Sequence, residues 1–281
     1  MHVFTNSWIT GIREKGTEKY TIISNPSWGY AADPFVIEQE DDVYIFAELF
    51  DQRLGSAGLG YIKYKNGKFG KWIVTMKETY HLSYPYLFFM DNDMYICPES
   101  CSNETVYFYK CKKFPDLWEK QEPFISNMDC SDTSLFESNG EIYGVTCLFH
   151  EDPIRLLLFK YDRENNKAIF SPQNPVVSGG ELARSGGEFL KKDGGWIRVS
   201  QDCSDEYGKS LVFTNFLLEW PYIKEDIIRR ISAKDVKIDR KLNVQGIHTY
   251  NCSNNYEVMD FKIRGVNLIP RIRKHIHLKQ R

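Results

Sequence analysis

The sequence predicts an all-β protein, a five-bladed β-propeller with four-stranded blades and a funnel-shaped site at the central axis. Three observations predict this fold class. A pair of apolar runs joined by a polar turn recurs five times along the chain. The pair recurs about every 50 residues, a length typical of a propeller blade. Helical periodicity is almost absent, because only residues 222–232 have an arguable helical period, and they are equally compatible with a strand.

Equivalent residues of the first three units are nearly evenly spaced. The first apolar run of each unit begins at Asp33, Tyr84 and Asp132, which are 51 and 48 positions apart. The second apolar runs contain tyrosines with the same two spacings, Tyr44, Tyr95 and Tyr143. Two independent markers therefore give the same period, which predicts the first three blades.

Polar turns divide each unit into a hairpin, and further strands follow the hairpin. Aspartate, asparagine and glycine are typical of such turns when β-branched and aromatic runs flank them. The predicted turns lie at residues 41–42, 91–93, 139–140, 193–195 and 254–255. Later strands of the blades are expected at residues 60–64, 71–74, 106–109 and 155–161. The fifth hairpin, over residues 247–259, has the weakest pattern.

The period crosses every candidate domain boundary. Although 281 residues permit one large domain or two small ones, we expect a single propeller domain over residues 1–263 and a basic tail over residues 264–281. Hydrophobic residues make up 42% and charged residues 26% of the chain, which excludes a disordered or collagen-like protein. The net charge of −2 gives no reason to expect a nucleic-acid partner.

The sequence also favours a cytoplasmic location. No apolar run approaches the roughly 18 residues of a membrane helix, and residues 1–16 lack the pattern of a signal peptide. The seven cysteines form no CxxC pair and have no regular spacing, so we expect reduced thiols rather than disulfides or a zinc site.

Carboxylates are predicted to gather at the axis, because the innermost strand of every propeller blade faces it. Asp33 and Asp132 begin inner strands, and Glu48 and Glu99 end second strands. Carboxylates held close together shift one another's pKa and can divide into a general acid and a general base. We therefore expect these four residues to be catalytic. The alternative is that Asp33, before Pro34, and Asp132 only form turns at the strand ends.

Five further residues are expected to bind substrate: Tyr84, Arg184, Asp202, His248 and Trp28. Arg184 can clamp a carboxylate or a phosphate, and its alternative is a salt bridge to one of the axial acids. His248 can bind substrate or hold a water or cation, and a structural histidine is the alternative. An Asp-x-Asp triplet at residues 91–93 is interpreted as a hairpin turn rather than as a metal site. We assign no metal ligand and no cofactor from the sequence, which leaves metal dependence open.

The order of these short motifs resembles a known family. Ala32-Asp33-Pro34-Phe35 is similar to the start of the five-bladed furanosidase clan that includes glycoside hydrolase family 43. The whole series resembles the amino-terminal propeller domain of glucosamine inositolphosphorylceramide transferases and its stand-alone bacterial relatives, over residues 28 to about 260. The remaining motifs of the series are Ser83-Tyr84-Pro85, Pro98-Glu99-Ser100, Arg184-Ser185-Gly186-Gly187, Gln201-Asp202-Cys203, Tyr207-Gly208 and His248.

The resemblance implies a carbohydrate-active propeller. In the family 43 pattern the first-blade aspartate is the general base, a role that falls to Asp33. That pattern continues with a second aspartate that tunes pKa values and a glutamate that acts as the acid. The sequence departs from it, with Tyr84 in place of the second aspartate and Asp132 in place of the glutamate. The bacterial relatives tend to be associated with cell-surface polysaccharide assembly.

We therefore expect a glycosyl-transferring enzyme of cell-surface polysaccharide or glycolipid biosynthesis, in which the axial carboxylates act on a sugar substrate or an activated sugar donor. An inverting glycoside hydrolase of the family 43 type, acting on a furanoside or pyranoside, is one alternative. A glycan-binding propeller without catalytic activity is the other.

The tail is basic, whereas the rest of the chain has more acidic than basic residues. Residues 264–281 contain six Lys or Arg and no Asp or Glu, which leaves 30 basic and 38 acidic residues in the body. Ile269, Ile272, Ile276 and Leu278 are interspersed with the basic residues, a composition compatible with an interfacial segment on an anionic membrane. We expect a peripheral association with the inner membrane face. A solvated tail, or one packed on the acidic body, is the alternative.

Overall fold

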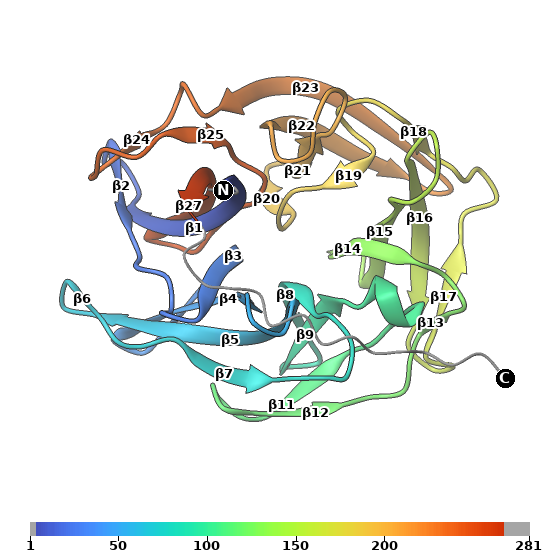
Figure 1. The fold of residues 1–281 in the computed structure, drawn as a ribbon. Coiled ribbons are helices and arrows are strands. Elements are labelled where there is room, and N and C mark those ends of the chain that lie inside the picture. Colours follow the sequence, from blue (N-terminus) through green and yellow to red (C-terminus); the bar gives the residue numbers. More distant parts are fainter. Residues whose placement is uncertain (1–3, 267–281) are drawn as a thin grey trace, which may run out of the picture.

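The computed structural model describes residues 4–266 and confirms the five-bladed β-propeller (Figure 1). Within that range the one helical element is a short 3-10 helix, η1 (Cys101–Asn103). Residues 222–232, whose sequence pattern is compatible with either a helix or a strand, form strand β23 (Tyr222–Ser232). No helix of the described range is long and apolar enough to cross a membrane.

Blades 1 and 2 follow the two clearest units of the repeat. Blade 1 contains β3 (Gly29–Gln39), β4 (Asp42–Asp51), β5 (Ser56–Lys65), β6 (Lys68–Phe69) and β7 (Ile73–Met76). Blade 2 contains β8 (Ser83–Met90), β9 (Asp93–Glu99), β11 (Tyr109–Lys113) and β12 (Leu117–Lys120). A small ladder of β10 (Thr105–Val106) and β13 (Ile125–Ser126) follows blade 2.

Blades 3 and 4 continue in the same antiparallel order. Blade 3 contains β14 (Cys130–Ser138), β15 (Glu141–Leu148), β16 (Arg155–Asp162), β17 (Lys167–Phe170) and β18 (Val177–Ser178). Blade 4 contains β19 (Arg184–Ser185), β20 (Leu190–Lys192), β21 (Gly195–Asp202), β22 (Ser210–Glu219) and β23.

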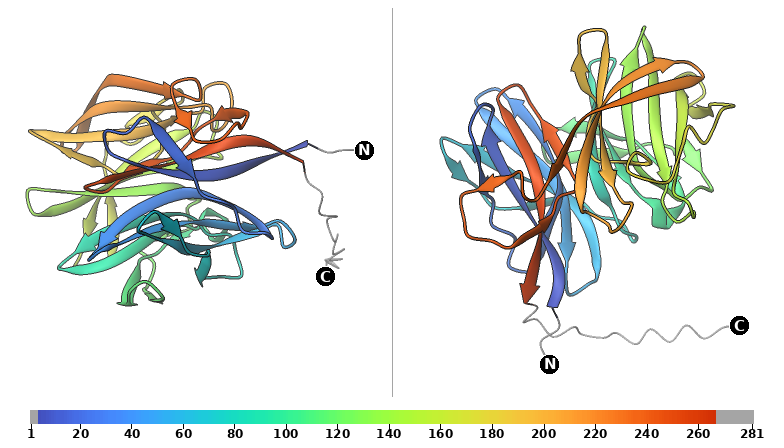
Figure 2. Two further views of the ribbon diagram at one scale, coloured as in Figure 1. Left: turned by 90° about the vertical axis from the view of Figure 1, so that its left-hand side faces the viewer. Right: turned by 90° about the horizontal axis from the view of Figure 1, so that it is seen from above.

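The fifth blade joins the two ends of the chain. It combines β24 (Lys237–Ile238), β25 (Val244–Gly246), β26 (Tyr250–Cys252) and β27 (Tyr256–Val266) with β1 (Phe4–Glu14) and β2 (Lys19–Ile22). Strand β1 pairs with β27 along its whole length, from Phe4 opposite Val266 to Glu14 opposite Tyr256. Figure 2 shows both ends of the described chain leaving on one side of the ring. Since β27 runs to Val266, the strand extends three residues past the predicted domain boundary at residue 263.

The inner strands of blades 1 to 3 share a local distortion at their equivalent positions. Each has a register shift typical of a β-bulge, between Ala32 and Phe35 in β3 and at the matching places in β8 and β14. The residues at the bulges have left-handed backbones, with φ of 49° at Asp33, 46° at Tyr84 and 49° at Asp132. Aspartate tolerates this conformation better than most residues. The 51- and 48-residue spacings therefore mark a repeated backbone feature as well as a repeated strand.

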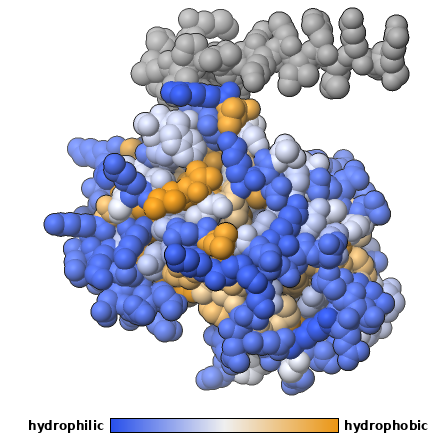
Figure 3. Space-filling model, turned by 90° about the horizontal axis from the view of Figure 1, so that it is seen from below, coloured by the Kyte–Doolittle hydropathy of each residue, from blue (hydrophilic) through white to orange (hydrophobic). Residues whose placement is uncertain are grey.

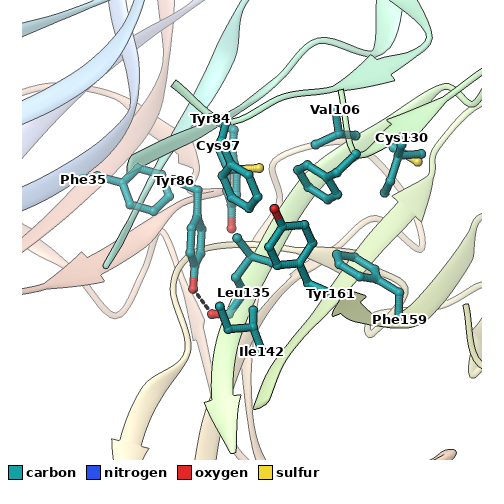
Figure 4. Close-up of a cluster of buried hydrophobic side chains, with 13 residues drawn as sticks. Phe35, Tyr84, Tyr86, Cys97, Val106, Cys130, Leu135, Ile142, Phe159 and Tyr161 are labelled. Carbon is teal, nitrogen blue, oxygen red and sulfur yellow. Dashed lines mark hydrogen bonds between the residues drawn. The ribbon is translucent and has the colours of Figure 1, made fainter. Parts of the chain in front are cut away.

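Aromatic side chains fill the space between blades, which accounts for much of the 15% aromatic content. Figure 4 shows the cluster in which the inner strands of three blades meet, with Phe35 from β3, Tyr86 from β8 and Leu135 from β14. The Tyr86 hydroxyl donates a hydrogen bond of 2.5 Å to the carbonyl oxygen of Leu135. Flat rings suit the narrow gaps between twisted sheets and carry a polar end that can be satisfied inside the core. All seven cysteines are free thiols.

Candidate active site

Six charged or titratable side chains that the sequence analysis selected lie together around the propeller axis. A seventh, which it did not select, lies with them. We call this group the axial cluster: Asp33, Glu48, Glu99, Asp132, Arg184, His248 and Asp260. Its members come from all five blades. Their side chains are almost entirely withdrawn from water, since even the most exposed, Glu99, retains 11% of its side-chain accessibility.

Asp33 is held from several sides at the bulge of β3. Its Oδ1 accepts a 2.6 Å hydrogen bond from the hydroxyl of Thr249, and its Oδ2 accepts one of 3.3 Å from the backbone N–H of Tyr84. The Nε2 atom of His248 lies 3.4 Å from Oδ1. Burial raises the pKa of Asp33 to about 6, although the neighbouring His248 opposes the rise. The carboxyl group therefore changes its charge close to neutral pH.

Asp260, which the sequence analysis missed, organises the backbone around Asp33. Its Oδ2 accepts the N–H of Asp33 at 2.9 Å, and its Oδ1 accepts the N–H groups of His248 and Thr249 at 3.2 and 3.0 Å. The side chain is fully buried in β27. An acidic residue inside the apolar run of residues 258–261 was the available signal, because a charge is costly there unless it is fully hydrogen-bonded.

His248 is enclosed by carboxylates and aromatic rings. Its Nδ1 lies 2.7 Å from Oδ2 of Asp260, and the ring of Trp8 stacks on the imidazole with centroids 3.8 Å apart. Burial lowers the pKa of His248, but Asp260 and Asp33 outweigh that effect and raise it above its ordinary value. The charged imidazolium is thus favoured between two acids. Asp33, His248 and Asp260 also offer ligand atoms within 4.8 Å of one another, a grouping that fits a cation if the imidazole is neutral.

Arg184 links two carboxylates of the axial cluster. Its Nε lies 2.5 Å from Oδ2 of Asp132, and its Nη2 lies 3.7 Å from Oε2 of Glu99. The guanidinium also packs against the rings of Phe149 and Tyr207, 4.1 and 4.9 Å from their centroids. The structure therefore shows the salt bridge to an axial acid that the sequence left open as the alternative to substrate binding.

The pKa values of both glutamates of the axial cluster are raised. Burial and the charge of Asp132 raise the pKa of Glu99 to about 8, although Arg184 opposes the rise. Burial, together with the charges of Asp33 and Glu99, also raises the pKa of Glu48 well above its ordinary value. Glu48 lies 3.5 Å from Nε2 of His81, a side chain that keeps 35% of its accessibility. The cluster thus contains carboxyl groups with different affinities for a proton.

Three of the expected substrate-binding residues lie elsewhere or face another way. Tyr84 is completely buried in the core, where its hydroxyl donates to the carbonyl oxygen of Gly187 at 2.8 Å. Its ring packs edge-on against Phe35 and stacks with Tyr86, so Tyr84 is part of the hydrophobic core. Trp28 precedes β3 and packs against the outer part of blade 1.

Asp202 is one position out of phase with the axis. In blade 4 the partner of Arg184 is Gln201, because successive side chains of a strand point to opposite faces. Gln201 donates a 3.0 Å hydrogen bond to Oδ2 of Asp132. Asp202 instead accepts hydrogen bonds from Ser204 and Ser210 away from the cluster. Gln201 belongs to the motif Gln201-Asp202-Cys203 that the sequence analysis quoted. It is Gln201, rather than Asp202, that reaches the axial cluster.

Comparison with known proteins gives one family match. Residues 18–251 match the family model described as "Glucosamine inositolphosphorylceramide transferase 1, N-terminal". Proteins named glucosamine inositolphosphorylceramide transferase 1 from Oryza sativa subsp. indica and Arabidopsis thaliana are each 28% identical, over 195 and 197 residues. The alignments cover 65% of this chain and 25% of each plant protein, so the chain spans about a quarter of the relatives it matches.

Two solved structures illustrate the likeness in fold. Zg3597, a family 117 enzyme of Zobellia galactanivorans, superposes with a TM-score of 0.59 at 12% identity and 90% coverage of both chains. The α-L-arabinofuranosidase PaAbf62A of Podospora anserina gives 0.58 at 8% identity, covering 94% of this chain and 98% of its own. At these identities the likeness shows the fold alone.

Proposed function

The chain belongs to the family defined by the N-terminal domain of glucosamine inositolphosphorylceramide transferase 1, and from this premise we propose that it is a glycosyl-transferring enzyme with its acid and base in the axial cluster. One observation supports the proposal above the others. Asp33, with a pKa of about 6, and Glu99, with a pKa of about 8, are in opposite protonation states at neutral pH. A fixed pair of this kind is what general acid–base chemistry at a glycosidic carbon requires.

The proposed reaction transfers a sugar from a donor to a hydroxyl group. The bond from the anomeric carbon to the leaving oxygen breaks, and Glu99 gives its proton to that oxygen. The bond from the anomeric carbon to the acceptor oxygen forms, and Asp33 takes the proton that the acceptor hydroxyl loses. Arg184 positions Glu99 and Asp132, while Asp260 holds Asp33 and His248 in place. The substrate class is an activated sugar donor with a sugar or glycolipid acceptor, in cell-surface glycan synthesis.

Hydrolysis is the second candidate, and the proton on Glu99 favours it. A leaving alkoxide depends on that proton more strongly than the phosphate of an activated donor does. Water would then take the place of the acceptor hydroxyl, and an inverting geometry leaves room for it between the two carboxyl groups. The structural neighbours named as glycoside hydrolases agree with this candidate. The third candidate, a glycan-binding domain, is supported by the small share of the plant relatives that the chain covers.

The proposal predicts a bell-shaped pH dependence of kcat/KM. Activity needs Asp33 ionised and Glu99 protonated, so it should rise as pH passes about 6 and fall as pH passes about 8. Glu99→Gln should remove the falling limb and most of the rate. Glu188→Gln is the matched control, because burial raises the pKa of Glu188 to about 7 but this residue lies outside the axial cluster. A profile with one limb, or a falling limb that survives in Glu99→Gln, would contradict the assignment.

We also propose a cytoplasmic location at the inner membrane face, with residues 267–281 as a membrane-binding segment. These residues lie outside the described part of the chain, and their sequence holds five Lys or Arg and no Asp or Glu. Replacing the five basic residues by glutamine should weaken sedimentation with phosphatidylserine vesicles, because each basic residue near an anionic surface contributes about 1 kcal/mol. Sedimentation equal to that of the unchanged chain at low salt would refute this role for the segment.

A further inference from the structure

A pocket of about 360 Å³ opens at the edge of blade 1. We call five residues of its wall the blade 1 rim: Trp28, Arg53, Leu54, Val74 and Lys77. These residues come from the segment before β3, the turn between β4 and β5, and the end of blade 1 around β7. Figure 3 looks onto the side of the molecule where β5, β7 and β12 lie, and shows hydrophobic side chains at the surface between hydrophilic ones. The blade 1 rim thus combines exposed apolar side chains with basic ones.

The basic side chains of the rim are unpaired. Arg53 and Lys77 are exposed, and neither has an ion pair with any residue in the range 4–266. By contrast, Lys63 and Lys65 of the same blade both pair with Asp42. The rim therefore presents two positive charges that form no ion pair within residues 4–266.

The one acid in the pocket wall is already engaged. Oδ1 of Asp51 accepts the backbone N–H groups of Arg53 and Leu54 at 2.8 and 3.3 Å, which fixes the turn between β4 and β5. The turn in this way holds Arg53 and Leu54 side by side at the surface. With two basic side chains against one carboxylate, the pocket wall has a net positive charge, which favours an anionic ligand.

Apolar side chains stand beside these charges. Leu54 is 60% exposed at the turn and Val74 is 44% exposed on β7, while the indole of Trp28 lies partly buried between them and the core. Exposed aliphatic groups next to cations suit the boundary between lipid head groups and acyl chains. Tryptophan is also enriched at that boundary. The combination distinguishes a membrane surface from a free phosphate, which would use the charges alone.

The rim lies at the same end of the propeller as the axial cluster. Glu48 of the cluster and Asp51 of the pocket wall are three positions apart on β4. Strand β27 has the same place in blade 5 that β4 has in blade 1, next to the inner strand, and it passes from Asp260 to its end at Val266. The described chain therefore ends at this same end of the propeller (Figure 2), and the basic residues 267–281 follow Val266 in the sequence.

We propose that the blade 1 rim docks on the surface of an anionic phospholipid bilayer. Arg53 and Lys77 contact lipid phosphates, and Leu54 and Val74 enter the interfacial layer. Docking in this orientation places the end of the propeller that carries the axial cluster toward the bilayer. This inference concerns binding only and does not depend on the proposed reaction.

Sedimentation of the full chain with vesicles tests the proposal. The probes are vesicles of phosphatidylcholine alone and of phosphatidylcholine mixed with phosphatidylserine. The double variant Arg53→Glu with Lys77→Glu should lower partitioning onto the anionic vesicles by about tenfold or more, since each charge near the surface matters. Leu54→Ser should lower the binding that remains when salt screens the charges. Because all three side chains are exposed, the variants should keep the thermal midpoint of the unchanged protein.

A matched charge reversal elsewhere separates a docking surface from a simple effect of net charge. Lys167 in blade 3 and Lys234 after β23 are exposed and have no ion pair within residues 4–266. Lys167→Glu with Lys234→Glu changes the net charge equally and should leave vesicle binding intact. Residues 267–281 are unchanged in both double variants, so their contribution cancels. Equal losses in the two double variants, no loss in the blade 1 variant, or equal binding to neutral vesicles would each overturn the proposal.

Discussion

Replacing Asp33 by asparagine should lower turnover about a hundredfold or more while the protein stays folded. The loss is the scale expected when a general base is removed. Folding should survive because asparagine has nearly the same shape and tolerates the left-handed φ of 49°. Its amide oxygen can still accept the N–H of Tyr84, and the Thr249 hydroxyl can turn to accept from the amide nitrogen.

Asp91→Asn is the matched control for Asp33→Asn. Asp91 also has a left-handed φ, 52°, but it lies in an exposed hairpin turn paired with Arg163. The control should change neither turnover nor thermal midpoint measurably. If Asp33→Asn keeps full turnover, Asp33 has no part in the chemistry. If it unfolds the chain, Asp33 acts as the turn-forming residue that the sequence left open.

Replacing Arg184 by methionine should produce the largest loss of stability, about 3–5 kcal/mol in the free energy of unfolding. The substitution keeps much of the packing against Phe149 and Tyr207 but removes the positive charge. Asp132, whose side chain is 3% exposed, then keeps its hydrogen bond from Gln201 but becomes a buried charge without an ionic partner. Chemical denaturation monitored by far-UV circular dichroism measures the loss.

Two further variants identify the cause of that loss. Combining Arg184→Met with Asp132→Asn should recover a large part of the stability, because no uncompensated charge remains. Lys224→Met removes an ion pair with Glu219 in which both side chains are largely exposed, so it should cost at most about 1 kcal/mol. A double variant as unstable as Arg184→Met alone would show that lost packing, rather than the stranded charge of Asp132, is responsible.

The sequence was sufficient for the parts of the fold that local patterns encode. Hairpins at residues 41–42, 91–93 and 139–140 follow from turn residues between apolar runs, and the structure has a turn at each place. The nearly equal spacing of Asp33, Tyr84 and Asp132 coincides with the bulges of the inner strands, although nothing in the pattern indicated a bulge or a left-handed backbone. Convergence at the axis then follows from the radial symmetry of the fold.

Closure of the ring could not be predicted in the same way. Strand β1 pairs with β27 across more than 240 positions of sequence, and such a pairing leaves no local signal in either strand. Trp8 therefore reaches His248 through a contact that only the closed fifth blade creates. Asp260 was missed for a related reason, because its partners are backbone N–H groups of residues 33, 248 and 249 rather than a sequence motif.

The choice between Gln201 and Asp202 shows a second limit. A shift of one position reverses which side chain faces the axis, and the pairing of Arg184 with Gln201 was not known from the sequence. Tyr84 has the correct phase, yet its long side chain passes into the core. Periodicity therefore gives the position of a residue along a strand, while the length of its side chain decides which neighbours it reaches.

The most direct test of the central claim is product analysis for the unchanged chain and Asp33→Asn side by side. Each is incubated with nucleotide-sugar donors plus a sugar acceptor, and separately with aryl glycosides, and the products are identified by mass spectrometry. We expect the unchanged chain to form a glycosylated acceptor and Asp33→Asn to lose that product. Release of free sugar from aryl glycosides would instead favour the hydrolase. Binding of a sugar by the unchanged chain with no product from either class of substrate would contradict a catalytic axial cluster and leave a glycan-binding propeller.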